Sequence, residues 1–274
     1  MDDVARHYQL GNLLETILGR LATSGKDLDS LVPDDLAGVD EFHIRGREAT
    51  VELASLASVS AADRVIDVGS GLGGSSRYLA ASHGCRVDGV DLTPEYCETA
   101  RELTRRVGLS ERAQFHCASA LATPFEDDTF DVAWTQHVQM NIADKAGLYR
   151  EIHRVLKPGG RFVFHDILAG PEQPAHYPTH WAEQEEMSHL IAPDALRQVV
   201  EECGFRVVEW RDTTDIAREW YLAAAARAQR DGPPELGLHL LLGETGPDKF
   251  ANVGRNLSER RLTVYQGLLE SMES

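Results

Sequence analysis

The sequence predicts an α/β fold with a mostly parallel, doubly wound sheet. From Arg64 onward, short apolar runs alternate with amphipathic stretches, a rhythm typical of βαβ units. The first run ends in a glycine-rich turn that leads directly into a helical pattern. The strands are predicted at residues 64–68, 86–91, 113–118, 130–136, 161–166, 205–210 and 261–269.

Helices are expected between these strands. Thr93 is placed to cap a helix that begins at the following proline, and Asp144 is placed to cap the helix before the fifth strand. Gly159 and Gly160 are expected to break the chain before that strand begins. Further helices are predicted from Pro193, near 214–230 and near 247–260.

Two segments are expected to cover the carboxyl edge of the sheet. Residues 1–60 are predicted to be a helical lid, and residues 61–274 the main domain, with an inserted cap at 167–192 after the fifth strand. One lid helix follows from the helical spacing of Leu10, Leu13, Leu14, Ile17 and Leu21. A second is predicted from Arg47, with core-facing Val51, Leu53, Leu56 and Ala57.

Composition and charge restrict the partners and the compartment. The chain has 274 residues and a formal net charge of −17, and such an acidic surface repels nucleic acid and anionic membranes. Its four cysteines are scattered, which suits reduced thiols. No secretory signal or membrane span is recognisable, so a cytoplasmic location is expected. Nothing in the pattern indicates an oligomeric state.

The glycine-rich turn lies in VIDVGSGLGGSSRYLA, residues 65–80. Gly69, Gly71 and Gly74 satisfy the dinucleotide pattern G-x-G-x-x-G, and Asp91 follows Gly69 by 22 residues. However, Asp67 stands in the strand where a pyrophosphate-binding site disfavours negative charge. A carboxylate there favours a cationic ligand instead, and S-adenosylmethionine is such a ligand.

Residues around this turn are therefore candidates for holding S-adenosylmethionine. Glycines allow the backbone to approach the ligand closely, and Asp91 is placed to accept hydrogen bonds from ribose hydroxyls. The alternative is that the glycines form only a tight turn and that the acids are solvated. The complete set of cofactor candidates is Asp67, Gly69, Ser70, Gly71, Gly73, Asp91, Leu92, Ser119, Ala120 and Gln136.

At these residues the sequence resembles class I S-adenosylmethionine-dependent methyltransferases. The resemblance covers about residues 60–265 and includes D-x-G-x-G-x-G, Asp91, TPFEDDTFDVAW and LKPGGRFVFHD. It implies a Rossmann-like, seven-stranded sheet in which RLTVYQGLL is an antiparallel last strand. One departure is Ser119, where family members often have an aspartate that contacts adenine. Adenine recognition is therefore expected to use backbone groups and apolar contacts from Leu92 and Leu121.

FHIRGREAT, WTQHVQMNIADK and GLHLLLG are similar to the branch that includes sarcosine/dimethylglycine N-methyltransferases. His43 belongs to the first of these segments, and Gln136, His137 and Asn141 follow the fourth strand. His137 is the candidate catalytic residue, with a capping or packing role as the open alternative. Gln136 is placed to touch either the methionine part of the cofactor or the acceptor.

Aromatic residues are further candidates for the acceptor site. Tyr8, Tyr177 and Trp181 offer faces that favour a cationic amine, although packing of the lid on the sheet explains them equally well. Asp166, at the end of the fifth strand, is expected to cap a turn, with a position facing the pocket as the alternative. His176 and His180 have helical spacing, but a proline lies between them, and no metal site is expected.

The sequence thus predicts a small-molecule methyltransferase, with an amine nitrogen as the favoured acceptor, as in the sarcosine/dimethylglycine branch. Methylation of oxygen or carbon in a phenolic, quinone or other natural-product acceptor is the alternative. Two hypotheses of other classes are a nicotinamide-dependent oxidoreductase, which the G-x-G-x-x-G match favours, and a cofactor-binding protein without catalysis. Asp67 disfavours the oxidoreductase.

Overall fold

The computed structural model describes residues 8, 11–232 and 234–273. Its core is a seven-stranded sheet with the order β3-β2-β1-β4-β5-β7-β6, in which only β7 is antiparallel to its neighbours. The predicted doubly wound sheet with an antiparallel last strand is therefore confirmed. The strands are β1 (Arg64–Val68), β2 (Arg86–Asp91), β3 (Ala113–Cys117), β4 (Phe130–Gln136), β5 (Leu156–Ala169), β6 (Phe205–Asp212) and β7 (Leu262–Ser271).

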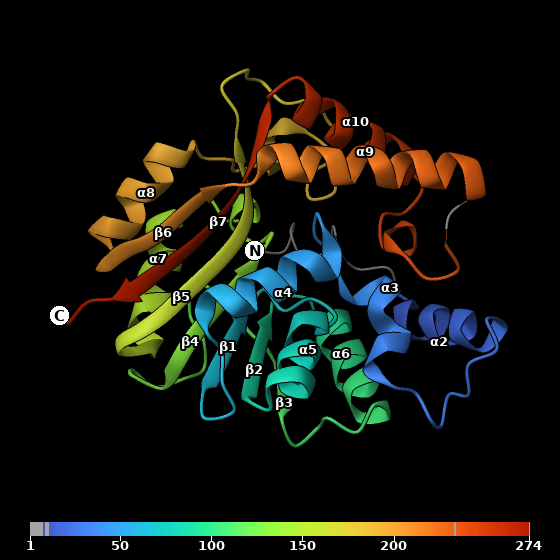
Figure 1. Cartoon of the computed structure of the whole chain (residues 1–274), viewed down its shortest axis with the longest axis horizontal. Coiled ribbons are helices and arrows are strands. Elements are labelled where there is room, and N and C mark those ends of the chain that lie inside the picture. The colour runs from blue at the N-terminus through green and yellow to red at the C-terminus, as the bar shows by residue number, and fades with distance from the viewer. Residues whose placement is uncertain (1–7, 9–10, 233, 274) are drawn as a thin grey trace.

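Helices cover both faces of this sheet (Figure 1). Successive strand residues point to opposite faces, so Val65 packs with the first helix layer and Ile66 with the second. The first layer consists of α4 (Gly46–Ala57), α5 (Gly74–His83) and α6 (Pro94–Arg106). The second layer consists of α7 (Lys145–Val155) and α8 (Pro193–Glu202).

The remaining helices lie outside these two layers. Trp181, Tyr221 and Leu257 share one buried cluster, which joins the insertion after β5 to the two long helices that lie between β6 and β7 in the chain. Leu13 and Tyr96 belong to another, which joins the N-terminal segment to α6. The helices are α2 (Leu13–Thr23), α3 (Ala37–Asp40), α9 (Thr214–Asp231) and α10 (Gly246–Ser258), with short 3-10 turns at Pro33–Leu36, Gln139–Asn141, Glu185–Met187 and Leu238–Leu240.

The fifth strand is longer than the sequence predicts. Gly159 and Gly160 were expected to precede the strand, but they lie within it, because β5 begins at Leu156. The glycines occupy a shift in register between β4 and β5. The other end of β5 reaches Ala169, since Ile167 and the two residues after it pair with β7. The predicted insertion at 167–192 therefore leaves the sheet only after Ala169.

Other details of the helices also differ from the prediction. Val51 was expected to face the core, but its side chain is 41% exposed, whereas Leu53 and Ala57 are fully buried. Thr93 precedes α6 as expected, yet its side chain does not cap the helix. Asp144 does cap α7, because its carboxylate accepts a hydrogen bond from the Gly147 amide at 2.7 Å. Leu10 lies outside the described residues.

The N-terminal segment is fixed to the sheet domain by polar contacts. The Glu95 carboxylate, in the first turn of α6, accepts hydrogen bonds from the Gly11 amide at 2.9 Å and the Leu13 amide at 3.0 Å. At α3, Asp40 forms an ion pair with Arg77 of α5, and both side chains are almost completely buried. Burial nevertheless raises the pKa of Asp40, although the Arg77 guanidinium opposes this shift.

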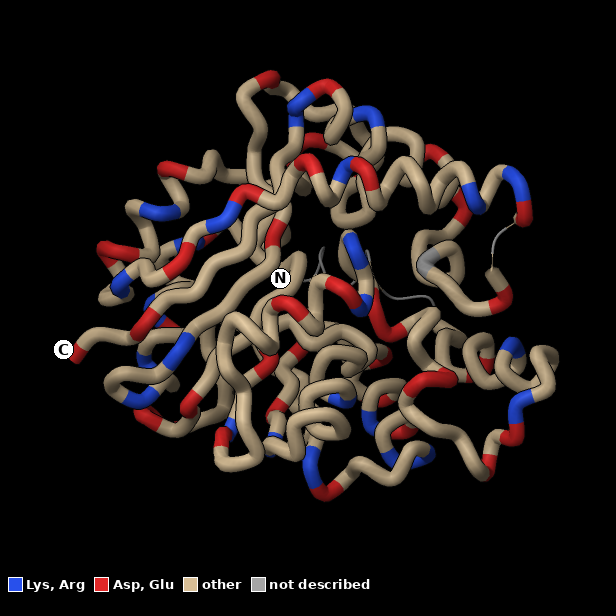
Figure 2. Tube along the Cα trace, viewed as in Figure 1, with Lys and Arg blue, Asp and Glu red and all other residues tan. Residues whose placement is uncertain are grey.

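Charged residues are distributed over the outer surface. Figure 2 shows Lys and Arg interspersed with Asp and Glu over helices and loops. Within the described part of the chain, no helix is long and apolar enough to cross a bilayer.

We expect Arg77→Ala to lower the free energy of unfolding by about 3–5 kcal/mol, because it leaves the Asp40 carboxylate buried without its partner. Urea unfolding at pH 7 measures this loss. Arg197→Ala is the matched control, since the Arg197–Glu201 pair is 49% exposed on both sides, and its loss should stay within about 0.5 kcal/mol. A loss below about 1 kcal/mol for Arg77→Ala would contradict the structural role of the pair.

Candidate active site

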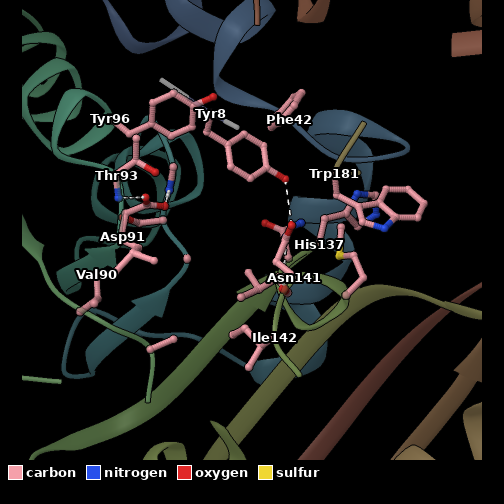
Figure 3. Close-up of a pocket in the computed structure, with 18 of the residues that line it drawn as sticks. Tyr8, Phe42, Val90, Asp91, Thr93, Tyr96, His137, Asn141, Ile142 and Trp181 are labelled. Carbon is pink, nitrogen blue, oxygen red and sulfur yellow. Dashed lines mark hydrogen bonds between the residues drawn. The ribbon is translucent and has the colours of Figure 1, made fainter. Parts of the chain in front are cut away.

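A cavity of about 590 Å³ lies at the carboxyl ends of β1, β2 and β4. Its walls come from the loops after these strands, from the N-terminal segment and from the insertion after β5. Figure 3 shows Asp91, Thr93 and Tyr96 on one side of the cavity and Phe42, His137 and Trp181 on the other, with Tyr8 between them. We call these sides the cofactor half and the acceptor half.

The glycine loop borders the cofactor half with its backbone. Gly71 has a φ of +54°, and a Cβ atom at this position would enter open space on the cavity side. Gly73 has a different role, because a Cβ there would collide with Phe115 behind the loop. At Gly71 the backbone therefore borders the cavity with no side chain between them, as a site for a closely held ligand requires.

Asp91 holds the end of β2 to the glycine loop. Its carboxylate accepts hydrogen bonds from the Gly71 amide at 2.9 Å and the Thr93 amide at 2.8 Å. Burial raises the pKa of Asp91, and these backbone donors oppose the shift. A carboxylate has about four lone-pair positions, so two amide donors leave acceptor capacity for a ligand in the cavity.

Asp67 is the second carboxylate of the cofactor half. It is only 3% exposed and accepts a hydrogen bond from the Ser76 hydroxyl of α5 at 2.6 Å. Burial raises the pKa of Asp67 to about 7, and the negative charge of Asp91 contributes to the rise. A ligand with a positive charge near this carboxylate would restore its ionised form.

Several polar atoms of the cofactor half lack an internal partner. The Ser70 and Tyr96 hydroxyl oxygens are buried and form no hydrogen bond to the described residues, and both side chains belong to residues that line the cavity. Buried polar groups are almost always paired, so these atoms are candidates for contacts with a ligand. The Ser119 hydroxyl is already engaged, since it accepts a hydrogen bond from the Leu121 amide at 3.1 Å.

Gln136 connects the two halves. Its amide oxygen accepts hydrogen bonds from the Trp134 indole at 2.9 Å and the Ser75 hydroxyl at 2.5 Å. An indole N–H can only donate, so Trp134 fixes the orientation of the amide. The amide nitrogen consequently faces the His43 imidazole at 3.0 Å and, more distantly, the Thr50 hydroxyl.

His43 and His137 line the acceptor half. The His137 ring stacks on the His165 ring with a centroid distance of 5.2 Å, and His43 lies edge-on to both rings. Burial lowers the pKa of His43 to about 4, that of His165 to about 3 and that of His137 well below its usual range. These imidazoles are therefore neutral at pH 7.

The upper wall of the acceptor half is aromatic. The Tyr8 hydroxyl donates a hydrogen bond to the Asn141 side chain at 3.2 Å (Figure 3). The Phe42 and His180 rings are stacked with a centroid distance of 6.4 Å. The Trp181 indole donates to the Ser188 hydroxyl at 2.9 Å, which fixes the orientation of the indole within the insertion after β5.

The structure brings nearly all of the predicted site residues together. Those that line the cavity are Tyr8, His43, Asp67, Gly69, Ser70, Gly71, Asp91, Leu92, Ser119, Ala120, Gln136, His137, Asn141 and Trp181. Gly73 and Tyr177 do not, since Gly73 makes room for Phe115 and Tyr177 packs against the apolar cluster of the insertion.

The sequence analysis missed several cavity residues. Tyr96 lies in the helix that follows Asp91, so its position after the second strand was a usable signal. Phe42 is the neighbour of His43 and was passed over. Met140, His180 and Met187 also line the cavity, but the last two lie in a stretch without periodicity and gave no signal.

The other predicted polar residues have structural partners. Asp166 accepts a hydrogen bond from the Val138 amide at 2.8 Å, which confirms its role in capping the turn after β4. His176 pairs with Glu259 at 2.9 Å, and His180 is hydrogen-bonded to the Tyr221 hydroxyl at 3.1 Å.

Comparison with known proteins identifies the domain that carries this cavity. Residues 66–164 match the family described as Methyltransferase domain. Residues 66–164 of this chain are therefore a methyltransferase domain. The matched residues include the glycine loop, Asp91 and the end of β4, which are the parts of the domain that form the cofactor half.

The relatives differ in the atom that they methylate. The chain is 37% identical over 140 residues to the chloroplastic tocopherol O-methyltransferase of Arabidopsis thaliana, covering 50% of this chain and 40% of that protein. It is 32% identical over 154 residues to a sarcosine/dimethylglycine N-methyltransferase of Aphanothece halophytica, covering 56% of each. The predicted similarity to that branch is thus confirmed. The chain spans about half the length of the curated relatives it matches.

A solved structure extends the likeness in fold to almost the whole chain. The geranyl diphosphate C-methyltransferase of Streptomyces coelicolor A3(2), solved in complex with S-adenosylhomocysteine, has a TM-score of 0.70 and 16% sequence identity. The match covers 99% of this chain and 97% of that one. The chain therefore shares its overall fold with the C-methyltransferase.

The histidines of the methyltransferase domain predict a specific pH effect on stability. His165 has a pKa of about 3 in the folded protein and about 6.5 in an unfolded chain. The contribution of the neutral His165 imidazole to the free energy of unfolding is complete above pH 6.5 and is lost as the pH falls toward 3. Relative to wild type, His165→Gln should therefore gain about 1.4 kcal/mol per pH unit between pH 6.5 and 4.5.

Urea unfolding at several pH values measures this difference. The comparison between variants is needed because burial raises the pKa values of Asp67 and Asp166 to about 7. These two carboxyl groups increase the free energy of unfolding as the pH falls below 7, which opposes the effect of His165. His153→Gln is the matched control for loss of an imidazole outside the cluster. Parallel curves for His165→Gln and wild type would contradict the prediction.

Proposed function

We propose that this protein transfers a methyl group from S-adenosylmethionine to a small molecule that is enclosed in the acceptor half. The proposal is carried by one observation: the open backbone at Gly71 lies beside Asp91, in a cavity that continues into a separate, apolar half. The family match over residues 66–164 supports the same conclusion.

The residues of the cofactor half fit S-adenosylmethionine. Asp91 would accept hydrogen bonds from the ribose, and Asp67 would attract the positively charged part of the ligand. The buried hydroxyls of Ser70 and Tyr96 would gain the partners that they lack. The ligand carboxylate would find the amino-terminal end of α5, where backbone N–H groups favour an anion. When bound, S-adenosylmethionine supplies an electrophilic methyl group.

The chain itself would contribute orientation and exclusion of water. Gln136 holds the start of α5, through Ser75, at a fixed distance from His43 beside the acceptor half. Tyr8 and Trp181 form part of the wall above it, so a bound acceptor would be held in place and shielded from much of the surrounding water. Such an enclosed cavity suits a small molecule and disfavours a protein or nucleic acid as acceptor.

The acceptor atom is a separate question. Resemblance to sarcosine/dimethylglycine N-methyltransferases favours an amine, and the likeness to tocopherol O-methyltransferase favours a hydroxyl. A nicotinamide-dependent oxidoreductase is disfavoured, because the buried Asp67 carboxylate would lie near a pyrophosphate.

We expect S-adenosylmethionine and S-adenosylhomocysteine, but not NAD, to raise the melting temperature. A ligand at 100 times its dissociation constant should raise the free energy of unfolding by about 2.7 kcal/mol. Asp91→Asn should weaken S-adenosylhomocysteine binding by at least about 1.5 kcal/mol in calorimetry, because charge-assisted hydrogen bonds to the ribose are lost. Asp88→Asn, in the same strand but outside the cavity, is the matched control. Stabilisation by NAD alone would refute the proposed cofactor.

Cofactor affinity should also depend on pH through Asp67. Its pKa is about 7 in the free protein, and a cationic ligand binds best when this carboxylate is ionised. Affinity for S-adenosylhomocysteine should therefore fall as the pH decreases from 8 to 6, by up to about tenfold per unit below pH 7. Asp67→Asn should bind more weakly at pH 8 and lose most of this dependence. An unchanged pH dependence in the variant would exclude Asp67 as its source.

A further inference from the structure

We infer that the acceptor half binds an uncharged, mainly apolar molecule through a hydroxyl group held at His137. This inference rests on the proposed function and names its substrate class. Besides Phe42, His137 and Trp181, the acceptor half includes the lining residues His43, Met140 and His180, which pack against them.

The cavity offers no cation to an anionic acceptor. Among the described residues that line it, none is Lys or Arg. Cations close to its walls are bound elsewhere: the Lys145 ammonium donates to the Ile142 carbonyl at 2.7 Å, and the Lys249 ammonium pairs with Glu183 at 2.6 Å. A carboxylate or phosphate on the acceptor would therefore lose its water shell without gaining a counter-charge.

The helix that begins beside the acceptor half does not replace such a cation. The first turn of α7 is already capped by the Asp144 carboxylate, which accepts the Gly147 amide at 2.7 Å. This cap occupies the amino-terminal end of α7, so the first turn of the helix does not take the place of a cation.

An ammonium group also lacks a partner in this half. Of the lining carboxylates, Asp40 is paired with Arg77 and Asp144 caps α7, whereas Asp67 and Asp91 lie in the cofactor half. Glu186 is exposed, so its charge remains in contact with water. A charged amine would therefore be desolvated in the acceptor half without a buried counter-ion.

The walls instead suit an apolar ligand. Phe42, Met140 and Trp181 present carbon and sulfur surface, and burial keeps the His43 and His180 imidazoles neutral by lowering their pKa values. Burial of apolar ligand surface stabilises a complex by roughly 25 cal/mol per Å². Small-molecule sites of this kind use few polar groups to orient the ligand.

His137 is a polar group of this wall that is free to do so. Its Nε2 atom is buried and has no hydrogen-bond partner among the residues that the structure describes. The residue has a φ of +54°, a strained conformation for histidine, and its amide donates to the His165 carbonyl at 2.9 Å. The surrounding structure thus holds an unpaired imidazole in the cavity wall.

A hydroxyl matches this imidazole best. A neutral imidazole has one donor and one acceptor nitrogen, and a hydroxyl can pair with either of them without carrying charge. When the methyl group passes to the hydroxyl oxygen, the O–C bond forms and the C–S bond breaks. The electron pair of the C–S bond stays on sulfur, and the hydroxyl proton passes to the His137 imidazole and then to water.

Three probes of one shape test the charge preference: 2-naphthol, 2-naphthylmethylamine and 2-naphthoate. Calorimetry at pH 7.5 with protein saturated with S-adenosylhomocysteine should give at least about tenfold tighter binding of 2-naphthol than of either charged probe. Equal or tighter binding of the amine or the carboxylate would overturn the inference. Failure of all three to bind would also overturn it, because the acceptor half would then not accept a flat apolar ring.

Variants test the residues separately. His137→Ala should weaken 2-naphthol binding at least tenfold and His137→Gln, which keeps a hydrogen-bonding group, less than threefold, with S-adenosylhomocysteine affinity unchanged in both. Met187→Arg places a cation in the cavity wall and should raise 2-naphthoate affinity at least tenfold. Met272→Arg, at an exposed position outside the cavity, should leave it unchanged. An unchanged 2-naphthoate affinity in Met187→Arg, or an unchanged 2-naphthol affinity in His137→Ala, would overturn the inference.

The same titrations separate this inference from the proposed function. S-adenosylhomocysteine binding is measured first, and 2-naphthol is then titrated with and without it. If 2-naphthol binds with the expected preference but S-adenosylhomocysteine does not bind, the proposed function fails and the charge preference of the cavity stands. If S-adenosylhomocysteine binds and the charge preference is absent, only the inference fails.

Discussion

The site depends on the fixed orientation of one side-chain amide, that of Gln136. The indole N–H of Trp134 can only donate, so the amide oxygen must face it, and the same oxygen accepts the Ser75 hydroxyl from the start of α5. The amide nitrogen is left to face His43, in the segment that leads into α4. One orientation thereby sets the positions of the end of β4, the helix after the glycine loop and the acceptor wall relative to one another. A reversed amide would place two donors together at Trp134.

The cofactor half was predictable because its residues are local to strand ends. Parallel strands bring their carboxyl ends to one edge of the sheet, so Asp67, Asp91 and Gln136 had to meet once the strand order was known. The hydrogen bonds of Asp91 to Gly71 and Thr93 were not foreseen, although they follow from the same proximity. Backbone amides compete with a ligand for the carboxylate, and the sequence pattern does not distinguish between the two partners.

The acceptor half was less predictable because tertiary packing decides its composition. His180 is positioned by the Tyr221 hydroxyl of α9 and by the Phe42 ring, which lie 41 and 138 residues away in the sequence. No period of 2 or 3.6 residues marks such contacts. The early end predicted for the fifth strand has a related cause: pairing of Ile167 with Val264 extends β5 beyond the point at which its local sequence stops resembling a strand.

The two halves also differ in how they tolerate burial of titratable groups. In the acceptor half the imidazoles are neutral, so they can be buried without a counter-ion. In the cofactor half burial brings the pKa of Asp67 to about 7, so a proton can take the place of a cationic ligand when none is bound. Under the proposed function, methyl transfer removes the positive charge from sulfur and leaves the charge of the ammonium group. The product is therefore attracted less strongly than the cofactor to Asp67 and Asp91, and this difference favours exchange of product for cofactor at the same carboxylates.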